Sequence, residues 1–377
     1  MKIVADENIP CVSEAFASLG DVTLVQGRGL QAAQVKDADV LLVRSVSRVD
    51  ESLLAGSSVR FVGSATIGFD HVDCDYLHAQ GIGFSTAPGS NATSAAEYVV
   101  SSLMALAEQQ GLVLAGKTVG IIGCGNVGSR VRARLTALDM RCQVNDPPLQ
   151  AAGVEDDFVD LATLLQSDIV TVHVPFTRGG AYPTFHLLDA QVFNQLQPGA
   201  VLINTSRGDV ADNVALNDAL AARDDLTVVL DVWEGEPSIN LSLLEKVALG
   251  TPHIAGYSLD GKLRGTEMIY RAACEFLDVP VQWNVSTVLP ADATVSLPTA
   301  ANDGTLLRAA VLGCYDVRAD DRRLRRLAGL AVDERPRYFD RLRKEYPVRR
   351  EFAATRLTGA SIPDAEREQL AGLGFAV

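Results

Sequence analysis

The chain has 377 residues, 47% of them hydrophobic and 6% aromatic, so it is long enough for two or three domains and too apolar to be disordered. A net charge of −14 gives an acidic surface that repels nucleic acid and anionic membranes, and we expect neither as a partner. No signal peptide precedes the first strand-like run, and no apolar run approaches the roughly 20 residues of a membrane helix. The six cysteines are scattered without a C-x-x-C pair, which predicts reduced thiols and a cytoplasmic protein.

Short aliphatic runs alternate with helix-like stretches over the first 90 residues. Runs of this length and apolarity are typical of buried parallel strands in βαβ units. The predicted strands cover residues 2–5, 22–25, 40–43, 60–63 and 82–84. Polar residues follow them directly, such as Ser45 and Thr66, and the carboxyl ends of such strands line the ligand site of an open α/β sheet.

A long helix is expected next, because Ser94 and Glu97 form an S-x-x-E capping box and Val99, Leu103 and Leu106 recur at helical spacing. The strand pattern then repeats over residues 118–122, 141–144, 169–174, 201–204 and 227–230. This repetition predicts a second doubly wound domain. A further helix over residues 262–278 is expected to return the chain to the first domain.

The last 92 residues differ in charge from the rest, with 15 Lys and Arg against 13 Asp and Glu. Residues 287–299 are strand-like, and the Arg-rich stretch 318–350 is helix-like. A basic segment on an acidic protein is attracted to the remainder, within one subunit or across two. Because two-fold homodimers are the commonest assembly, we expect this segment to form most of a homodimer interface. The segment also contains the apolar residues Leu306, Leu307, Val311, Leu324 and Leu327.

A G-x-G-x-x-G motif follows the strand at 118–122 and opens a helix. Its first glycine, Gly123, permits a tight turn, Gly125 lets the backbone approach a pyrophosphate, and Gly128 allows close helix–strand packing. Asn126 and Val127 complete the motif. A structural turn is the alternative, but this context favours a dinucleotide site.

Asp146 ends the next strand, about 20 residues after the glycines. A carboxylate there can bind the ribose hydroxyls of NAD and repel the 2′-phosphate of NADP. The alternative is a turn residue before Pro147 and Pro148.

Three segments at or beyond later strand ends supply an arginine, carboxylates and a histidine. Together these groups can bind a carboxylate, polarise a carbonyl and accept a hydroxyl proton while hydride leaves for NAD. They are residues 204–209 (N-T-S-R-G-D), 231–237 (D-V-W-E-G-E-P) and 251–257 (T-P-H-I-A-G-Y). Among the other histidines, His173 follows a strand near the expected cofactor, whereas His71, His78 and His186 are interpreted as structural. No Cys/His cluster indicates a metal.

In the order and spacing of these motifs, residues 1–285 resemble the D-isomer-specific 2-hydroxy acid dehydrogenases. The resemblance implies NAD as cofactor and Arg207, Glu236 and His253 as catalytic residues, with His253 as the acid/base. It implies that Asp231 binds the nicotinamide amide and Asp146 the adenosine ribose. Further NAD contacts are expected at Gly123, Gly125, Asn126, Val127, Gly128, Pro175, Ser206 and Gly256.

Four features resemble one branch of this family, which oxidises 4-phospho-D-erythronate in the synthesis of pyridoxal 5′-phosphate. They are residues 43–45 (V-R-S), 64–73 (S-A-T-I-G-F-D-H-V-D), 146–148 (D-P-P) and a C-terminal segment containing 315–318 (Y-D-V-R). This likeness implies substrate contacts at Ser45, Thr66 and Tyr257, and a homodimer built by the C-terminal segment.

The expected fold is α/β, with two doubly wound Rossmann-like domains flanking a cleft and a smaller C-terminal α+β domain. The substrate-binding domain is expected at 1–93 and 256–285, the NAD-binding domain at 94–255 and the dimerisation domain at 286–377. Two other functions stay open. One is a dehydrogenase for another phosphorylated acid such as 3-phosphoglycerate, and the other is a non-catalytic NAD-sensing protein resembling the corepressors built on this fold.

Overall fold

The structure is a computed structural model that describes residues 1–299, 304–359 and 361–377. Its contacts divide the chain into two compact units. The first unit holds residues 1–91 and 258–291, and the second holds residues 92–257 and 292–377. Among the described helices, none combines the length and the apolarity needed to cross a membrane.

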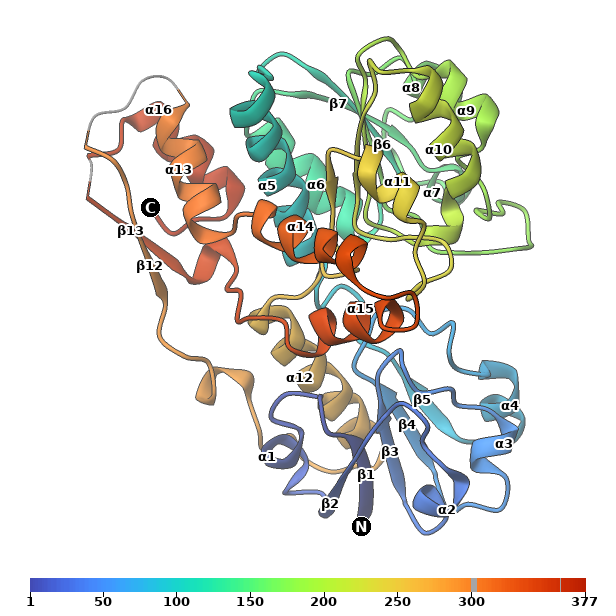
Figure 1. Cartoon of the computed structure of the whole chain (residues 1–377). Coiled ribbons are helices and arrows are strands. Elements are labelled where there is room, and N and C mark those ends of the chain that lie inside the picture. Colours follow the sequence, from blue (N-terminus) through green and yellow to red (C-terminus); the bar gives the residue numbers. More distant parts are fainter. Residues whose placement is uncertain (300–303, 360) are drawn as a thin grey trace. The chain divides into compact units, whose positions relative to one another are not determined.

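The first unit contains a parallel sheet in the order β2-β1-β3-β4-β5 (Figure 1). All five predicted strands are confirmed to within a residue of each end. Their bounds are β1 Lys2–Asp6, β2 Asp21–Val25, β3 Val40–Val43, β4 Phe61–Ser64 and β5 Gly83–Ser85. The helices of this unit are α1 Val12–Phe16, α2 Ala32–Val35, α3 Glu51–Leu54, α4 Cys74–Ala79 and α12 Leu259–Phe276. The helix expected over 262–278 is therefore α12, and it lies in the first unit as predicted.

Helices cover both faces of this sheet because alternate strand residues point to opposite sides. Ile3 and Leu42 pack into one cluster with residues of α1 and α12. Val4 and Leu41 pack into the other with residues of α2, α3 and α4. The prediction of buried strands is wrong for β2, which lies at the sheet edge and exposes most of its residues, including Leu24 at 50%.

The second unit contains a parallel sheet in the order β11-β10-β9-β8-β6-β7. Its strands are β6 Thr118–Ile122, β7 Arg141–Asn145, β8 Ile169–Val172, β9 Val201–Asn204, β10 Thr227–Leu230 and β11 Leu249–Gly250. Its helices before residue 257 are α5 Ala92–Gln110, α6 Asn126–Thr136, α7 Pro147–Ala151, α8 Leu161–Leu164, α9 Ala190–Gln195, α10 Asn213–Ala222 and α11 Leu241–Lys246. Residues of α5 and α6 share one core cluster, and residues of α8 to α11 share the other. The second doubly wound sheet is thus confirmed.

The predicted capping box at Ser94 and Glu97 is wrong. Helix α5 already begins at Ala92, so both residues lie inside it, and both are buried. Glu97 Oε1 accepts a hydrogen bond from the backbone N–H of Phe352, at 2.9 Å. The Glu97 side chain, which the sequence pattern assigned to a helix cap, therefore makes a tertiary contact instead.

The C-terminal segment is built mostly of helices, with one small parallel sheet of β12 and β13. Its elements are β12 Ala293–Ser296, α13 Thr305–Cys314, α14 Arg318–Leu324, α15 Arg335–Lys344, β13 Thr355–Thr358 and α16 Asp364–Leu373. The helical prediction for 318–350 is confirmed by α14 and α15. The strand expected over 287–299 is reduced to β12, which lies between Pro290 and Pro298, residues that cannot donate a backbone hydrogen bond to a sheet.

This segment shares its core with the rest of the second unit. The five apolar residues named for this segment are buried within the chain, at 7% exposure or less. Leu306 and Leu307 lie in one cluster with Leu103 of α5, and Leu324 and Leu327 in the cluster with α8 to α11. The basic segment also pairs with acidic residues of the same chain, as Arg318 does with Glu108. The homodimer interface expected for this segment stays a prediction.

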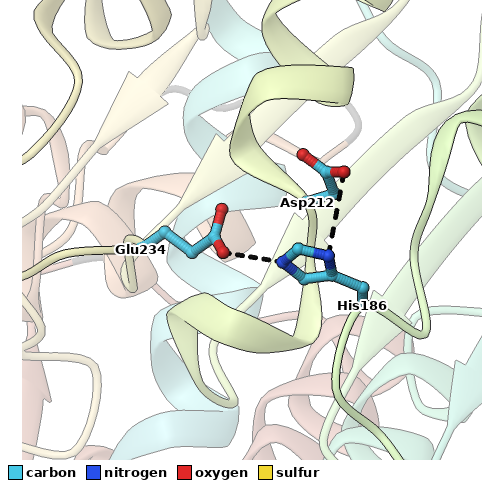
Figure 2. Close-up of side chains that lie close together, drawn as sticks. All are labelled: His186, Asp212 and Glu234. Atoms are coloured by element: carbon cyan, nitrogen blue, oxygen red, sulfur yellow. Dashed lines mark hydrogen bonds and ion pairs between the residues drawn. The ribbon is translucent and has the colours of Figure 1, made fainter.

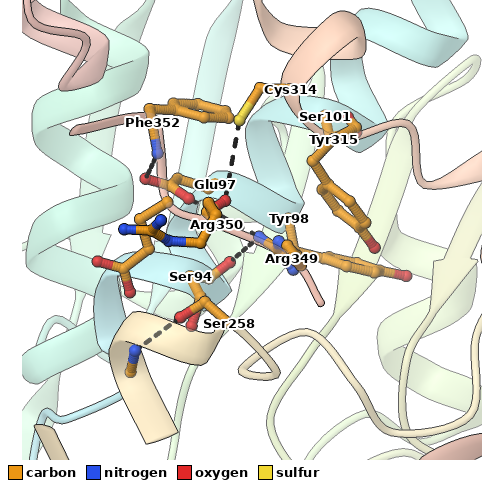
Figure 3. A network of polar contacts seen from close by, with 12 residues as sticks. Ser94, Glu97, Tyr98, Ser101, Ser258, Cys314, Tyr315, Arg349, Arg350 and Phe352 are labelled. Carbon is orange, nitrogen blue, oxygen red and sulfur yellow. Dashed lines mark hydrogen bonds and ion pairs between the residues drawn. The ribbon is translucent and has the colours of Figure 1, made fainter. Parts of the chain in front are cut away.

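A buried polar network joins α5 to the C-terminal segment (Figure 3). The guanidinium of Arg349 donates to the backbone oxygens of Ser94 and Ala255 at 2.6 and 3.1 Å, and stacks over Tyr315. The carboxylate of Glu97 lies 3.9 Å from Arg349 and 4.0 Å from Arg134. Among the described residues its Oε2 has no hydrogen-bond donor, and burial raises the pKa of Glu97 to about 8.

The pKa of Glu97 predicts how stability depends on pH. Between about pH 4.5 and 8 the folded protein holds a proton on Glu97 that the unfolded chain has released, so the free energy of unfolding falls as pH rises through this window. Each unit of pKa difference corresponds to about 1.4 kcal/mol. Glu97→Gln keeps an acceptor for Phe352 but has no carboxyl group to titrate. In thermal denaturation from pH 5 to 8, we expect its stability to lack this part of the decrease.

The exposed Glu245→Gln is the matched control for this experiment and should follow the wild type at every pH. A difference in melting temperature between Glu97→Gln and wild type that stays constant from pH 5 to 8 would show that Glu97 does not titrate in this range.

Candidate functional site

The glycine-rich turn joins β6 to α6 at the point where the strand order of the second sheet reverses. There β6 lies between β7 and β8, and ligands of open α/β sheets bind outside the strand ends at such a switch point. A Cβ on Gly128 would lie 2.0 Å from the backbone oxygen of Gly123, so only glycine permits this close packing. A Cβ on Gly125 would meet nothing within 4 Å, and α6 starts at the next residue. The turn therefore presents open backbone and a helix N-terminus, as binding of a pyrophosphate requires.

Asp146 lies directly beside this turn. Its Oδ2 accepts a hydrogen bond from the backbone N–H of Cys124 at 2.7 Å, and its Oδ1 caps α7 by accepting from Leu149 at 3.0 Å. Asp146 has two interpretations from its sequence context, as a ribose ligand or as a turn residue. It caps a helix, as a turn residue can, and it also adjoins the glycine-rich turn, as a ribose ligand would. Its contact with a ribose stays a prediction.

Arg207 follows β9 in a turn that Asn204 holds in place. The side-chain oxygen of Asn204 accepts hydrogen bonds from the backbone and hydroxyl of Ser206, at 3.0 and 2.7 Å. At the next position, a Cβ on Gly208 would lie 2.0 Å from the backbone oxygen of Trp233. Glycine therefore lets the turn of Arg207 touch the loop after β10, which carries Glu236.

His253 and Glu236 form a hydrogen-bonded pair, with 2.8 Å between Nδ1 and Oε2. The other oxygen of Glu236 accepts from the backbone N–H of Trp233 at 2.8 Å. Burial acts to raise the pKa of Glu236, but the nearby His253 and Arg343 and the hydrogen bonds outweigh it and lower the pKa. An ionised Glu236 can only accept, so Nδ1 of His253 is the donor and Nε2 is left to exchange a proton.

The buried carboxylate of Asp231 anchors the segment that carries His253. Its Oδ1 accepts from the hydroxyl of Thr251 and the N–H of Ile254, and its Oδ2 accepts from the N–H of Ala255. The backbone oxygen of Asp231 also accepts from the N–H of His253 at 2.7 Å. This anchoring role was missed from the sequence. The expected contact of Asp231 with a nicotinamide amide stays a prediction, as do the NAD contacts at Pro175 and Gly256.

His173 follows β8 and is neutral in the folded protein. Burial lowers the pKa of His173 to about 3. Its Nε2 lies 2.9 Å from the hydroxyl of Thr171, and its Nδ1 lies 3.1 Å from that of Thr205. Both ring nitrogens are therefore used in binding to protein hydroxyls.

The two substrate contacts expected in the first unit have different surroundings. Ser45 is exposed and lines a pocket of about 450 Å³, together with Arg48, His71 and other residues of that unit. Thr66 is not among the lining residues of this pocket. Its hydroxyl forms hydrogen bonds with the hydroxyl of Ser64 at 2.8 Å and with the backbone oxygen of Gly68 at 3.2 Å. Their contacts with substrate stay predictions.

The sequence also missed a cluster of His186, Asp212 and Glu234 in the second unit (Figure 2). The Nε2 of His186 lies 2.7 Å from Glu234, and its Nδ1 lies 3.7 Å from Asp212. The backbone N–H of His186 bonds to the oxygen of Asp209, two residues after Arg207. His186 therefore links the turn of Arg207 to the loop of Glu236. Its ligand atoms are close enough for a metal ion, but both carboxylates also bind the protein, since Glu234 accepts from the backbone N–H of Asn213 and Asp212 caps α10.

Tyr257, the third expected substrate contact, lies beside a cation from the C-terminal segment. The guanidinium carbon of Arg343 in α15 is 5.8 Å from the centroid of the Tyr257 ring. No sequence signal distinguished Arg343 from the other arginines of its basic stretch.

Comparisons with known proteins show which family the chain belongs to. Residues 89–255 match the family described as D-isomer specific 2-hydroxyacid dehydrogenase, NAD binding domain, and residues 289–374 match a domain of unknown function. Erythronate-4-phosphate dehydrogenase of Chromohalobacter salexigens is 47% identical over 100% of this chain and 99% of its own length. The enzyme of that name from Escherichia coli O1:K1 is 49% identical over 94% of this chain and 93% of its own.

Solved structures of the same fold cover about three quarters of the chain. An NAD⁺-bound 3-phosphoglycerate dehydrogenase of Entamoeba histolytica is 24% identical, with a TM-score of 0.64 over 75% of this chain and 98% of its own. A formate dehydrogenase of Staphylococcus aureus with NAD is also 24% identical, with a TM-score of 0.60 over 75% of this chain and 97% of its own.

The glycine-rich turn, the His253–Glu236 pair and the full-length relatives lead to one conclusion. This chain belongs to the NAD-dependent dehydrogenases of the D-isomer specific 2-hydroxyacid family, in the group formed by the erythronate-4-phosphate dehydrogenases.

Proposed function

We propose that this enzyme oxidises the C2 hydroxyl of 4-phospho-D-erythronate to 3-hydroxy-2-oxo-4-phosphooxybutanoate, with NAD as acceptor, in the synthesis of pyridoxal 5′-phosphate. The observation that carries the proposal is the hydrogen-bonded pair of His253 and Glu236 in the second unit, beside the loop of Arg207. The names of the full-length relatives support the choice of substrate.

In the proposed reaction His253 is the base. Its Nε2 would accept the proton of the C2 hydroxyl. Bound NAD would supply the acceptor for the hydride that leaves C2. The carboxylate of Glu236 holds Nδ1 and stabilises the positive charge that His253 gains. Arg207 binds the substrate carboxylate and polarises the C2 oxygen as it becomes a carbonyl. The oxidised acid and NADH account for both electrons, and the proton leaves through His253.

Replacement of His253 tests this mechanism. We expect His253→Ala to lower kcat by roughly 10²–10⁴-fold, because no other group would accept the hydroxyl proton, while NAD still binds. NADH absorbance measures kcat, and calorimetry measures NAD binding. The exposed His78→Ala is the control and should retain wild-type kcat. Near-normal turnover by His253→Ala would contradict a role as the base.

Replacement of Asp146 tests the proposed choice of NAD over NADP. Asp146→Asn keeps one oxygen acceptor, which is enough to cap α7, and loses the acceptor for Cys124 together with the charge that repels a 2′-phosphate. We expect the ratio of kcat/KM for NAD over that for NADP to fall by about tenfold or more. Asp157→Asn, at an exposed position nearby, should leave the ratio unchanged. An unaltered ratio in Asp146→Asn would remove this residue from the cofactor site.

The proposal includes a cytoplasmic homodimer. The free state of all six cysteines supports a reducing compartment. The five apolar residues of the C-terminal segment are buried within the chain, so a dimer would use other surfaces of that segment. Light scattering of the intact chain should give twice the mass of one chain, and the mass of a single chain would refute the dimer.

The same NADH assay separates the alternatives. A dehydrogenase for 3-phosphoglycerate would prefer that acid over 4-phospho-D-erythronate, and an NAD-sensing binding protein would form no NADH with either.

A further inference from the structure

Helix α15 is held firmly within the second unit, and Arg343 lies in its last turn. Phe339 of this helix is fully buried in the cluster that contains Leu324 and Leu327. The hydroxyl of Tyr338 donates to the backbone oxygen of Arg323 at 2.9 Å. The backbone of Arg343 therefore belongs to a helix that is anchored by packing within this unit.

The side chain of Arg343 reaches the loops that carry the proposed chemistry. It lies near the ring of Tyr257, with 5.8 Å from the guanidinium carbon to the ring centroid, and interacts electrostatically with Glu236. Tyr257 also contacts the ring of Tyr346, with 5.7 Å between the ring centroids. Among the described residues, the Nε of Arg343 is buried without a hydrogen-bond partner. The Nε atoms of Arg134 and Arg349 are likewise buried without a partner, but that of Arg343 lies near Tyr257 and is available to an acceptor supplied from outside the chain.

The substrate of the proposed function carries two anionic groups, and only one of them has a proposed partner. Arg207 is assigned to the carboxylate, next to the carbon that is oxidised. The phosphate lies at the other end of the four-carbon chain, on C4. A guanidinium forms paired hydrogen bonds with phosphate. Arg343 places such a group next to Tyr257, and its Nε–H has no hydrogen-bond partner among the described residues.

The extent of the relatives agrees with this assignment. The erythronate-4-phosphate dehydrogenases match 93% or more of this chain. The 3-phosphoglycerate and formate dehydrogenase structures match 75% of it. Formate has no phosphate, and the phosphate of 3-phosphoglycerate lies one carbon closer to C2. A phosphate on C4 extends farther from the reacting carbon and calls for a contact from another part of the chain.

We propose that Arg343 binds the C4 phosphate of the substrate, so that the C-terminal segment contributes a specificity-determining residue to the site. The inference rests on the proposed function, because it needs a substrate with a phosphate at this position. It assigns the segment after residue 291 a role in recognition that is separate from dimerisation.

The test compares 4-phospho-D-erythronate with D-erythronate, which has the same carbon chain and no phosphate. In Arg343→Gln we expect the ratio of kcat/KM for the phosphorylated acid over that for D-erythronate to fall by about 10- to 100-fold, mainly through a higher KM for the phosphorylated acid. The ratio of the two does not depend on how much of the variant is folded. Arg343→Lys, which keeps the charge without the planar fork, should recover part of the loss.

Arg341→Gln is the matched control, since it removes a cation from the same helical turn at an exposed position. It should leave both substrates unaffected. If Arg343→Gln lowers kcat/KM equally for both acids, or shifts the pH profile without changing their ratio, then Arg343 acts through Glu236 and the phosphate contact is refuted. A wild-type enzyme that oxidises neither acid would instead refute the proposed function.

Discussion

The carboxylate of Asp231 accepts hydrogen bonds from Thr251, Ile254 and Ala255 at 2.6 to 2.8 Å, in a position that is only 1% exposed. These bonds surround His253, which adopts a left-handed backbone conformation with φ of 58° that is unfavourable for a side chain with a Cβ. Charge-assisted bonds at low exposure are strong enough to hold such a conformation. The direction of the imidazole, and with it the bond to Glu236, follows from this one anchor.

The remaining parts of the site are positioned by contacts between loops at neighbouring strand ends. The loop after β9 touches the loop after β10 at Gly208 and Trp233, and His186 ties both to a third segment. Because β9 and β10 are paired in the sheet, their loops leave at the same edge. A parallel sheet thus brings together an arginine, a glutamate and a histidine that are up to 46 residues apart in the chain.

The parts of this arrangement that depend on local pattern could be predicted from the sequence. Short aliphatic runs located the strands, and the spacing of Gly123, Gly125 and Gly128 located the turn at the switch point. The predictions failed where tertiary contacts decide. The edge position of β2 leaves apolar residues exposed, and Glu97 has the spacing of a cap but is bonded to Phe352. Likewise, Arg343 and His186 acquire their roles only through partners that no local pattern specifies.

The bond between Glu97 and Phe352 spans 255 residues, which has a consequence for how the protein is made. During synthesis, α5 leaves the ribosome long before the segment that covers its Leu103 face has been translated. The first unit is in the same position, since α12 follows the whole second sheet in the chain. Neither unit can complete its core from one contiguous stretch of the nascent chain. Both units therefore expose apolar surface until late in translation. Chains that expose apolar surface in this way depend on chaperones.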